Sequence, residues 1–122
     1  MVSAQKEIQT KLTKNLLDLI ILELLENRAV CGYEIMSIIR KTYGVHLGAS
    51  TMYPTLNNLE SKNLVTNEWK MGNSHPKKVY KLTQEGKNEL QYSIFSLSQI
   101  CKTLYNDSKK TDKNMQMGIL IE

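Results

Sequence analysis

Apolar residues recur every three or four positions near the start of the chain. They fall on two neighbouring faces of a helix: Leu12, Leu16, Leu17, Ile20, Ile21, Leu24 and Leu25. An apolar surface this wide predicts a helix over residues 12–26 that packs on two sides. Residues 2–11 are polar, and they either extend this helix or fray.

A second helix is expected after a short connector at residues 27–30. Its apolar positions have helical spacing over residues 33–43. Gly44 follows directly and is expected to end the helix in the left-handed conformation, because glycine adopts positive φ without steric cost. Residues 45–49 then form a short extended link to a third helix.

Pro54 fixes the expected start of the third helix. Proline has no backbone N–H, so it is predicted to lie in the first turn, where such donors have no partner. The helix then begins near Ser50, and Ser50 or Thr51 is the expected cap. Asn63 is the expected left-handed terminator. Three apolar residues mark the inward face: Met52, Leu56 and Leu59.

The following residues predict a β-hairpin, called the wing below (residues 64–82). It comprises a strand, a turn rich in Gly, Asn, Ser and Pro at residues 72–76, and a return strand. Trp69 shares a face with Val65 and is expected to pack under the wing. On the return strand, Tyr80 and Leu82 share one face and Lys81 is on the other.

The last long segment predicts a helix over residues 84–107, capped by Thr83. Its apolar positions are spaced four, three, four and three apart: Leu90, Ile94, Leu97, Cys101 and Leu104. Such a seam on a lone helix calls for a second subunit, so these residues are the expected homodimer interface. The chain thus divides into a winged helix-turn-helix domain (1–83), a dimerisation helix (84–107) and a polar tail (108–122) expected to be disordered. The fold class is mainly α with a small β-hairpin.

Composition narrows the class of protein. The 122 residues carry a formal net charge of +4, which is compatible with a nucleic-acid partner and does not require one. The two cysteines suit a reducing cytoplasm better than a disulfide scaffold. The N-terminal residues resemble no signal peptide, and the run at residues 16–25 is too short to span a bilayer. A cytoplasmic protein without a membrane partner is expected.

Short polar residues near the start of the third helix suit DNA recognition. Such side chains reach base edges and phosphates, and asparagine can pair with adenine in a bidentate way. Taken alone, a face of this kind is more often simply solvated. The adjacent wing, with its several lysines, favours DNA. Tyr53 could either contact phosphate or fill the edge of the core. The candidate DNA-binding residues are Ser50, Thr51, Tyr53, Pro54, Thr55, Asn57, Asn58, His75, Lys77 and Lys78.

Other kinds of site have little support in the sequence. His46 and His75 share no metal-ligand spacing with the cysteines, so no metal and no cofactor are expected. No glycine-rich phosphate loop occurs, and no nucleophile has a recognisable base nearby. An enzyme is therefore not expected.

The motifs together resemble the PadR family of transcriptional regulators, over about residues 12–105. The matching segments are Gly32-Tyr33-Glu34-Ile35, Ser50 with Tyr53-Pro54-Thr55-Leu56, residues 59–65, and Tyr80-Lys81-Leu82-Thr83 with Gly86. The resemblance implies a homodimeric repressor on palindromic operator DNA. In such proteins the C-terminal helix packs against the N-terminal helix of the other subunit.

The resemblance also implies roles for particular residues. The recognition helix of the family corresponds to Ser50, Thr51, Tyr53 and the exposed residues after them, and its basic wing to Lys77 and Lys78. Some members bind flat aromatic compounds between the subunits, but the C-terminal helix here has no tryptophan. Two alternatives stay open: a winged helix used for protein–protein contact, and a sensor whose output is binding of an unknown small-molecule effector.

Overall fold

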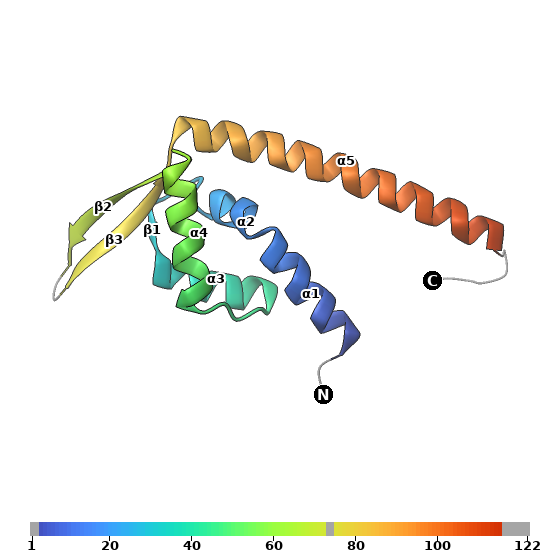
Figure 1. Ribbon diagram of the computed structural model, residues 1–122, viewed down its shortest axis with the longest axis horizontal. Helices are drawn as coiled ribbons and strands as arrows, with labels where there is room; N and C mark the ends of the chain where they lie inside the picture. Colours follow the sequence, from blue (N-terminus) through green and yellow to red (C-terminus); the bar gives the residue numbers. More distant parts are fainter. Residues whose placement is uncertain (1–2, 73–74, 116–122) are drawn as a thin grey trace. The chain divides into compact units, whose positions relative to one another are not determined.

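The computed structural model describes residues 3–72 and 75–115, with side chains as far as residue 109. The chain forms two compact units, Met1–Leu90 and Gln91–Glu122. The described residues form five helices and a three-stranded sheet, whose order along the chain can be followed in Figure 1. Their bounds are α1 Ala4–Asn15, α2 Leu17–Leu24, β1 Val30–Cys31, α3 Gly32–Tyr43, α4 Ala49–Ser61, β2 Val65–Met71, β3 Pro76–Leu82 and α5 Gln84–Met115.

The helix expected over residues 12–26 is two helices instead. The chain leaves helical geometry at Leu16, where φ is −100° and ψ is 16°. The break separates a largely exposed helix, α1, from a largely apolar helix, α2. In α2, four of eight residues are buried, whereas Thr13 is the only buried residue of α1. A bend at this point lets α2 enter the core while α1 stays largely in solvent.

The connector expected at residues 27–30 contains the start of a strand that the sequence did not predict, in addition to the two strands of the wing. Val30 and Cys31 form β1, which pairs antiparallel with β3 and gives the sheet order β1-β3-β2. Two residues carry no readable alternation, so the sequence could not reveal this strand. The expected left-handed positions are confirmed, because φ is 71° at Gly44 and 62° at Asn63.

The wing is an antiparallel hairpin that runs in register from Val65 opposite Leu82 to Met71 opposite Pro76. Figure 1 shows it reaching beyond the helices. Tyr80 is buried, but the prediction that Trp69 packs under the wing is wrong. Trp69 is 64% exposed. The reason is that the core ends before position 69 while the hairpin continues.

The joint between wing and final helix is built around Thr83. The Thr83 hydroxyl lies 3.0 Å from the carbonyl oxygen of Leu64, and its oxygen accepts the backbone N–H of Gly86 at 2.9 Å. The predicted cap is therefore confirmed. Gly86 is packed so closely that a Cβ would lie 2.1 Å from the Leu64 carbonyl oxygen. The glycine is required by this backbone contact.

Helix α5 continues to Met115, past the end expected at residue 107. Residues 116–122 of the expected polar tail lie outside the described part. Leu90 is only 1% exposed and belongs to the core of the first unit, so it is not available to a second subunit. The other residues of the expected seam lie in the second unit, and within that unit they are at least partly exposed: Ile94, Leu97, Cys101 and Leu104.

Candidate nucleic-acid interface

Helix α4 begins one residue before the expected position. Gly48 is its N-cap, with no side-chain hydrogen bond, so neither Ser50 nor Thr51 caps it. Pro54 is then the sixth residue and lies in the second turn, not the first. Since proline has no N–H, it cannot donate to the carbonyl of Ser50. That carbonyl, near the start of the exposed face, lacks its usual helical partner.

The two faces of α4 are divided as the sequence predicts. Met52, Leu56 and Leu59 are buried on the inner face. The outer face exposes Ser50, Thr51, Pro54, Asn57, Asn58 and Ser61. Thr55 differs from the other candidate DNA-binding residues of α4. Its side chain is half-buried, and its hydroxyl donates a hydrogen bond to the Thr51 carbonyl at 2.9 Å. That hydroxyl is therefore engaged within the helix.

Tyr53 packs against the start of α3 and is still 38% exposed. A Cβ placed on Gly32 would lie 2.7 Å from Cε1 of the Tyr53 ring. The close approach explains why a glycine begins α3 opposite this tyrosine. The ring thus packs at the edge of the domain, while part of it stays accessible, and the phosphate contact remains a prediction.

A hollow of about 230 Å³ lies beside the beginning of α4. Its lining comes from α3, the link and the first helical residues: Tyr33, Met36, Ser37, Arg40, His46, Leu47, Gly48 and Ala49. Arg40 and His46 are exposed here next to the N-terminus of α4, where backbone N–H groups favour anions. Sequence reasoning missed both residues. The available signal was the spacing of Tyr33, Ser37 and Arg40 along one side of α3.

The wing carries most of the positive charge beside α4. Lys77 and Lys78 are adjacent, so their side chains leave opposite faces of the hairpin. Lys77 is opposite Lys70 across the strands, and the Lys78 ammonium lies 5.6 Å from the centre of the Tyr80 ring. His75 is exposed at the turn, where its carbonyl accepts the N–H of Gly72 at 3.2 Å.

A side-chain hydrogen bond ties α4 to the wing. The amide of Asn67 on β2 donates to the carboxylate of Glu60 on α4. Both side chains are partly buried, so water competes weakly for this bond. The bond joins α4 to β2 near the start of the wing. Neither residue was a sequence-based candidate, since the pairing joins two different elements.

Other kinds of site are not evident in the described ranges, residues 3–72 and 75–115. They bring no three His, Cys, Asp or Glu side chains together as metal ligands. Their helices include none that is long and apolar enough to cross a bilayer. Cys31 is buried with its thiol 3.5 Å from a Glu34 carboxylate oxygen, and Cys101 is exposed.

The arrangement of α3, the link, α4 and the basic hairpin is a winged helix with a C-terminal helix, as the sequence predicts. A model of the PadR-like family of transcriptional regulators matches residues 21–92. The chain therefore belongs to the PadR-like family. No curated protein sequence matches it.

Solved structures agree with this assignment. A PadR family transcriptional regulator from Eggerthella lenta is 27% identical, with a TM-score of 0.74 over 82% of this chain and 88% of that one. A PadR family regulator from Clostridium difficile is 31% identical, with a TM-score of 0.70 over 75% and 96%. Bacillus subtilis PadR, in complex with operator DNA, is 32% identical, with a TM-score of 0.60 over 65% of this chain and 46% of that one.

Proposed function

We propose that this chain is a homodimeric transcriptional repressor that acts in the cytoplasm and binds palindromic operator DNA. The observation that carries the proposal is the polar outer face of α4, held beside a lysine-bearing wing by the Glu60–Asn67 bond. Family membership supports it, as does the structure of Bacillus subtilis PadR with operator DNA. In this proposal α4 is the recognition helix.

Different residues of the surface have different roles in the proposal. Ser50 and Thr51 lie at the start of α4, where hydroxyls and backbone N–H groups suit phosphate. Arg40, beside them, adds a guanidinium that can hold a phosphate with two hydrogen bonds. Asn57 and Asn58 are exposed farther along α4 and can read base edges. In a two-fold dimer, the two recognition helices enter major grooves about one helical turn apart.

Replacing Asn57 or Asn58 with alanine is expected to relax the preference for particular bases. Loss of a bidentate contact costs about 1–3 kcal/mol at the base concerned. Ser50→Ala is the matched control, because a lost phosphate contact weakens binding to every sequence equally. Selection of binding sites from random duplexes by each variant measures the effect. If both asparagine variants select the same bases as the parent protein, sequence is read by the wing or from DNA shape.

Removing a wing lysine is expected to weaken binding to all DNA sequences about equally. Lys77→Ala and Lys78→Ala should each lower the slope of log K against log salt by about one unit, if each neutralises one phosphate. Lys87→Ala is the control. This lysine lies on α5, just after the end of β3, and not on the strands or turn of the wing. Fluorescence anisotropy at several salt concentrations gives the slopes. A loss confined to the operator, with an unchanged slope, contradicts the phosphate role.

A further inference from the structure

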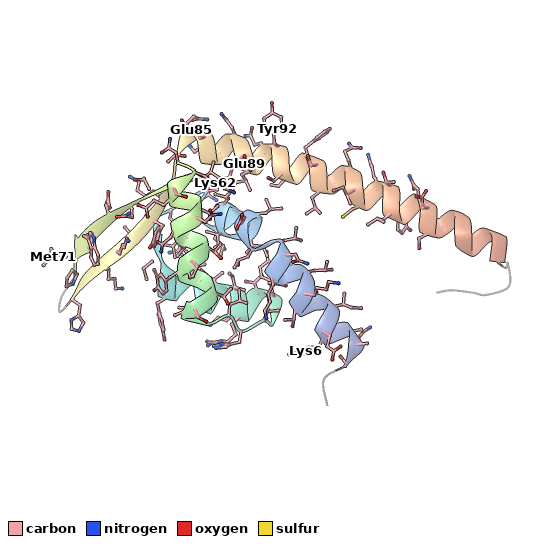
Figure 2. All side chains as sticks on the ribbon, viewed as in Figure 1. Lys6, Lys62, Met71, Glu85, Glu89 and Tyr92 are labelled. Carbon is pink, nitrogen blue, oxygen red and sulfur yellow. The ribbon has the colours of Figure 1, made fainter. Side chains whose placement is uncertain are left out.

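Two large apolar side chains of the wing are left in solvent. Trp69 is the only tryptophan of the chain, and Met71 beyond it is 83% exposed. Figure 2 shows Met71 at the outer end of the hairpin. Neither residue stabilises the core. We infer that Trp69 and Met71 form an apolar DNA contact that packs against the sugar–phosphate wall of the minor groove. This inference rests on the proposed function.

The orientation of the wing places these residues on the side of the recognition helix. Side chains two apart along a strand share a face, so Asn67, Trp69 and Met71 point to the same side of β2. Asn67 is the residue that bonds Glu60 of α4. The face that begins with a contact to α4 therefore continues outward through Trp69 and ends at Met71.

The charge of the wing as a whole indicates a polyanionic partner. The strands of the wing hold four lysines and one glutamate: Lys70, Lys77, Lys78, Lys81 and Glu68. Lys78 is directly opposite Trp69 and shares its face, so the wing has a lysine beside the ring. Lys70, Lys77 and Lys81 lie on the other face of the hairpin, where Lys70 is opposite Lys77. Like charges in opposite positions destabilise a hairpin. Glu68 offsets part of this repulsion through an ion pair with Lys70 at 3.7 Å. A phosphate backbone would relieve the rest.

DNA also explains why an exposed apolar ring lies beside Lys78 on a wing that is cationic on both faces. The walls of the minor groove are built from deoxyribose, which is apolar, between rows of phosphates. Proteins that enter this groove combine cationic side chains with apolar ones. A tryptophan ring can cover a sugar while its indole N–H donates to a phosphate oxygen. Lys78 then reaches the phosphates on either side.

The lone tryptophan allows a direct test on the full chain. The probe is a mixed-sequence DNA duplex at low salt, because a backbone contact does not depend on sequence. Binding is followed by anisotropy of labelled DNA, and access to Trp69 by acrylamide quenching of its fluorescence. DNA should protect Trp69 from acrylamide. Raising the protein concentration without DNA should leave the quenching unchanged.

Variants separate the apolar contact from the ionic one. Trp69→Ala should weaken binding by about tenfold, as expected for loss of a modest buried apolar area. Its salt slope should equal that of the parent, because no phosphate charge is lost, whereas Lys78→Ala should lower the slope. Trp69→Phe should recover most of the affinity. Thermal unfolding of Trp69→Ala should match the parent, since the side chain is exposed.

The outcomes distinguish this inference from the proposed function. If DNA binds but Trp69 stays fully accessible and Trp69→Ala binds as tightly as the parent, the inference is overturned and the function stands. If Trp69 becomes protected at high protein concentration without DNA, the face is covered by another copy of the chain, which also overturns it. If no duplex binds at all, both fail.

Discussion

Gly86→Ala is expected to destabilise the folded protein by about 2 kcal/mol. In an ordinary helix this change stabilises by about 1 kcal/mol, because alanine is the better helix former. Here the new Cβ would lie 2.1 Å from the carbonyl oxygen of Leu64, a backbone atom that cannot rotate away. Overpacking of this kind typically costs about 1–3 kcal/mol, and more where backbone must move. The clash therefore outweighs the gain in helix propensity.

Thermal unfolding at a fixed protein concentration measures this effect. A loss of about 2 kcal/mol lowers Tm by on the order of 10 °C in a domain of this size. Lys87→Ala is the matched control: it adds alanine at the next position of α5, where the side chain is exposed. Its Tm should stay close to that of the parent. If Gly86→Ala raises Tm, α5 begins differently from the structure described here.

The features that sequence reasoning placed correctly depend on neighbouring residues. Gly44 and Asn63 end their helices with positive φ because few other residues tolerate that conformation. Thr83 caps α5 because its hydroxyl reaches an N–H three residues on. The inner face of α4 follows from helical spacing alone. Each of these signals lies within a few residues, so the sequence displays it directly.

The features that were missed depend on distant parts of the chain. Strand β1 exists because Val30 and Cys31 pair with β3, which lies about fifty residues later. Trp69 is exposed because the core ends before its position, and strand alternation does not reveal where a core ends. Arg40 and His46 meet at a hollow built from three segments. The Glu60–Asn67 bond likewise joins a helix to a strand.

The exposed apolar side chains of α5 beyond Leu90 support the proposed homodimer. Described side chains in this segment include large apolar ones in solvent: Tyr92, Ile94, Phe95, Ile100, Leu104 and Tyr105. Ile94, Leu97, Cys101 and Leu104 follow one side of this helix, and apolar patches left in solvent often mark interaction sites. An isolated helix also gains little stability in water without packing. A second copy of α5 or α1 offers such packing. The exposed Ile8 and Leu12 on α1 are suited to the same role.

Leu97→Glu is therefore expected to convert the proposed homodimer into a monomer. The residue lies in the middle of the seam that Ile94, Cys101 and Leu104 continue, so in a two-fold interface it would bury a carboxylate near its symmetry mate. An unpaired buried charge costs several kcal/mol, and each 1.4 kcal/mol weakens dimerisation about tenfold.

Sedimentation velocity should show the change in mass, and operator affinity should fall because one half-site alone remains bound. Gln99→Glu is the control, since it adds the same charge two residues away, off the seam, where the side chain is already exposed and polar. This variant should remain dimeric. A Leu97→Glu protein that stays dimeric would place the interface away from this face of α5, and the apolar residues of α1 would then be the next to change.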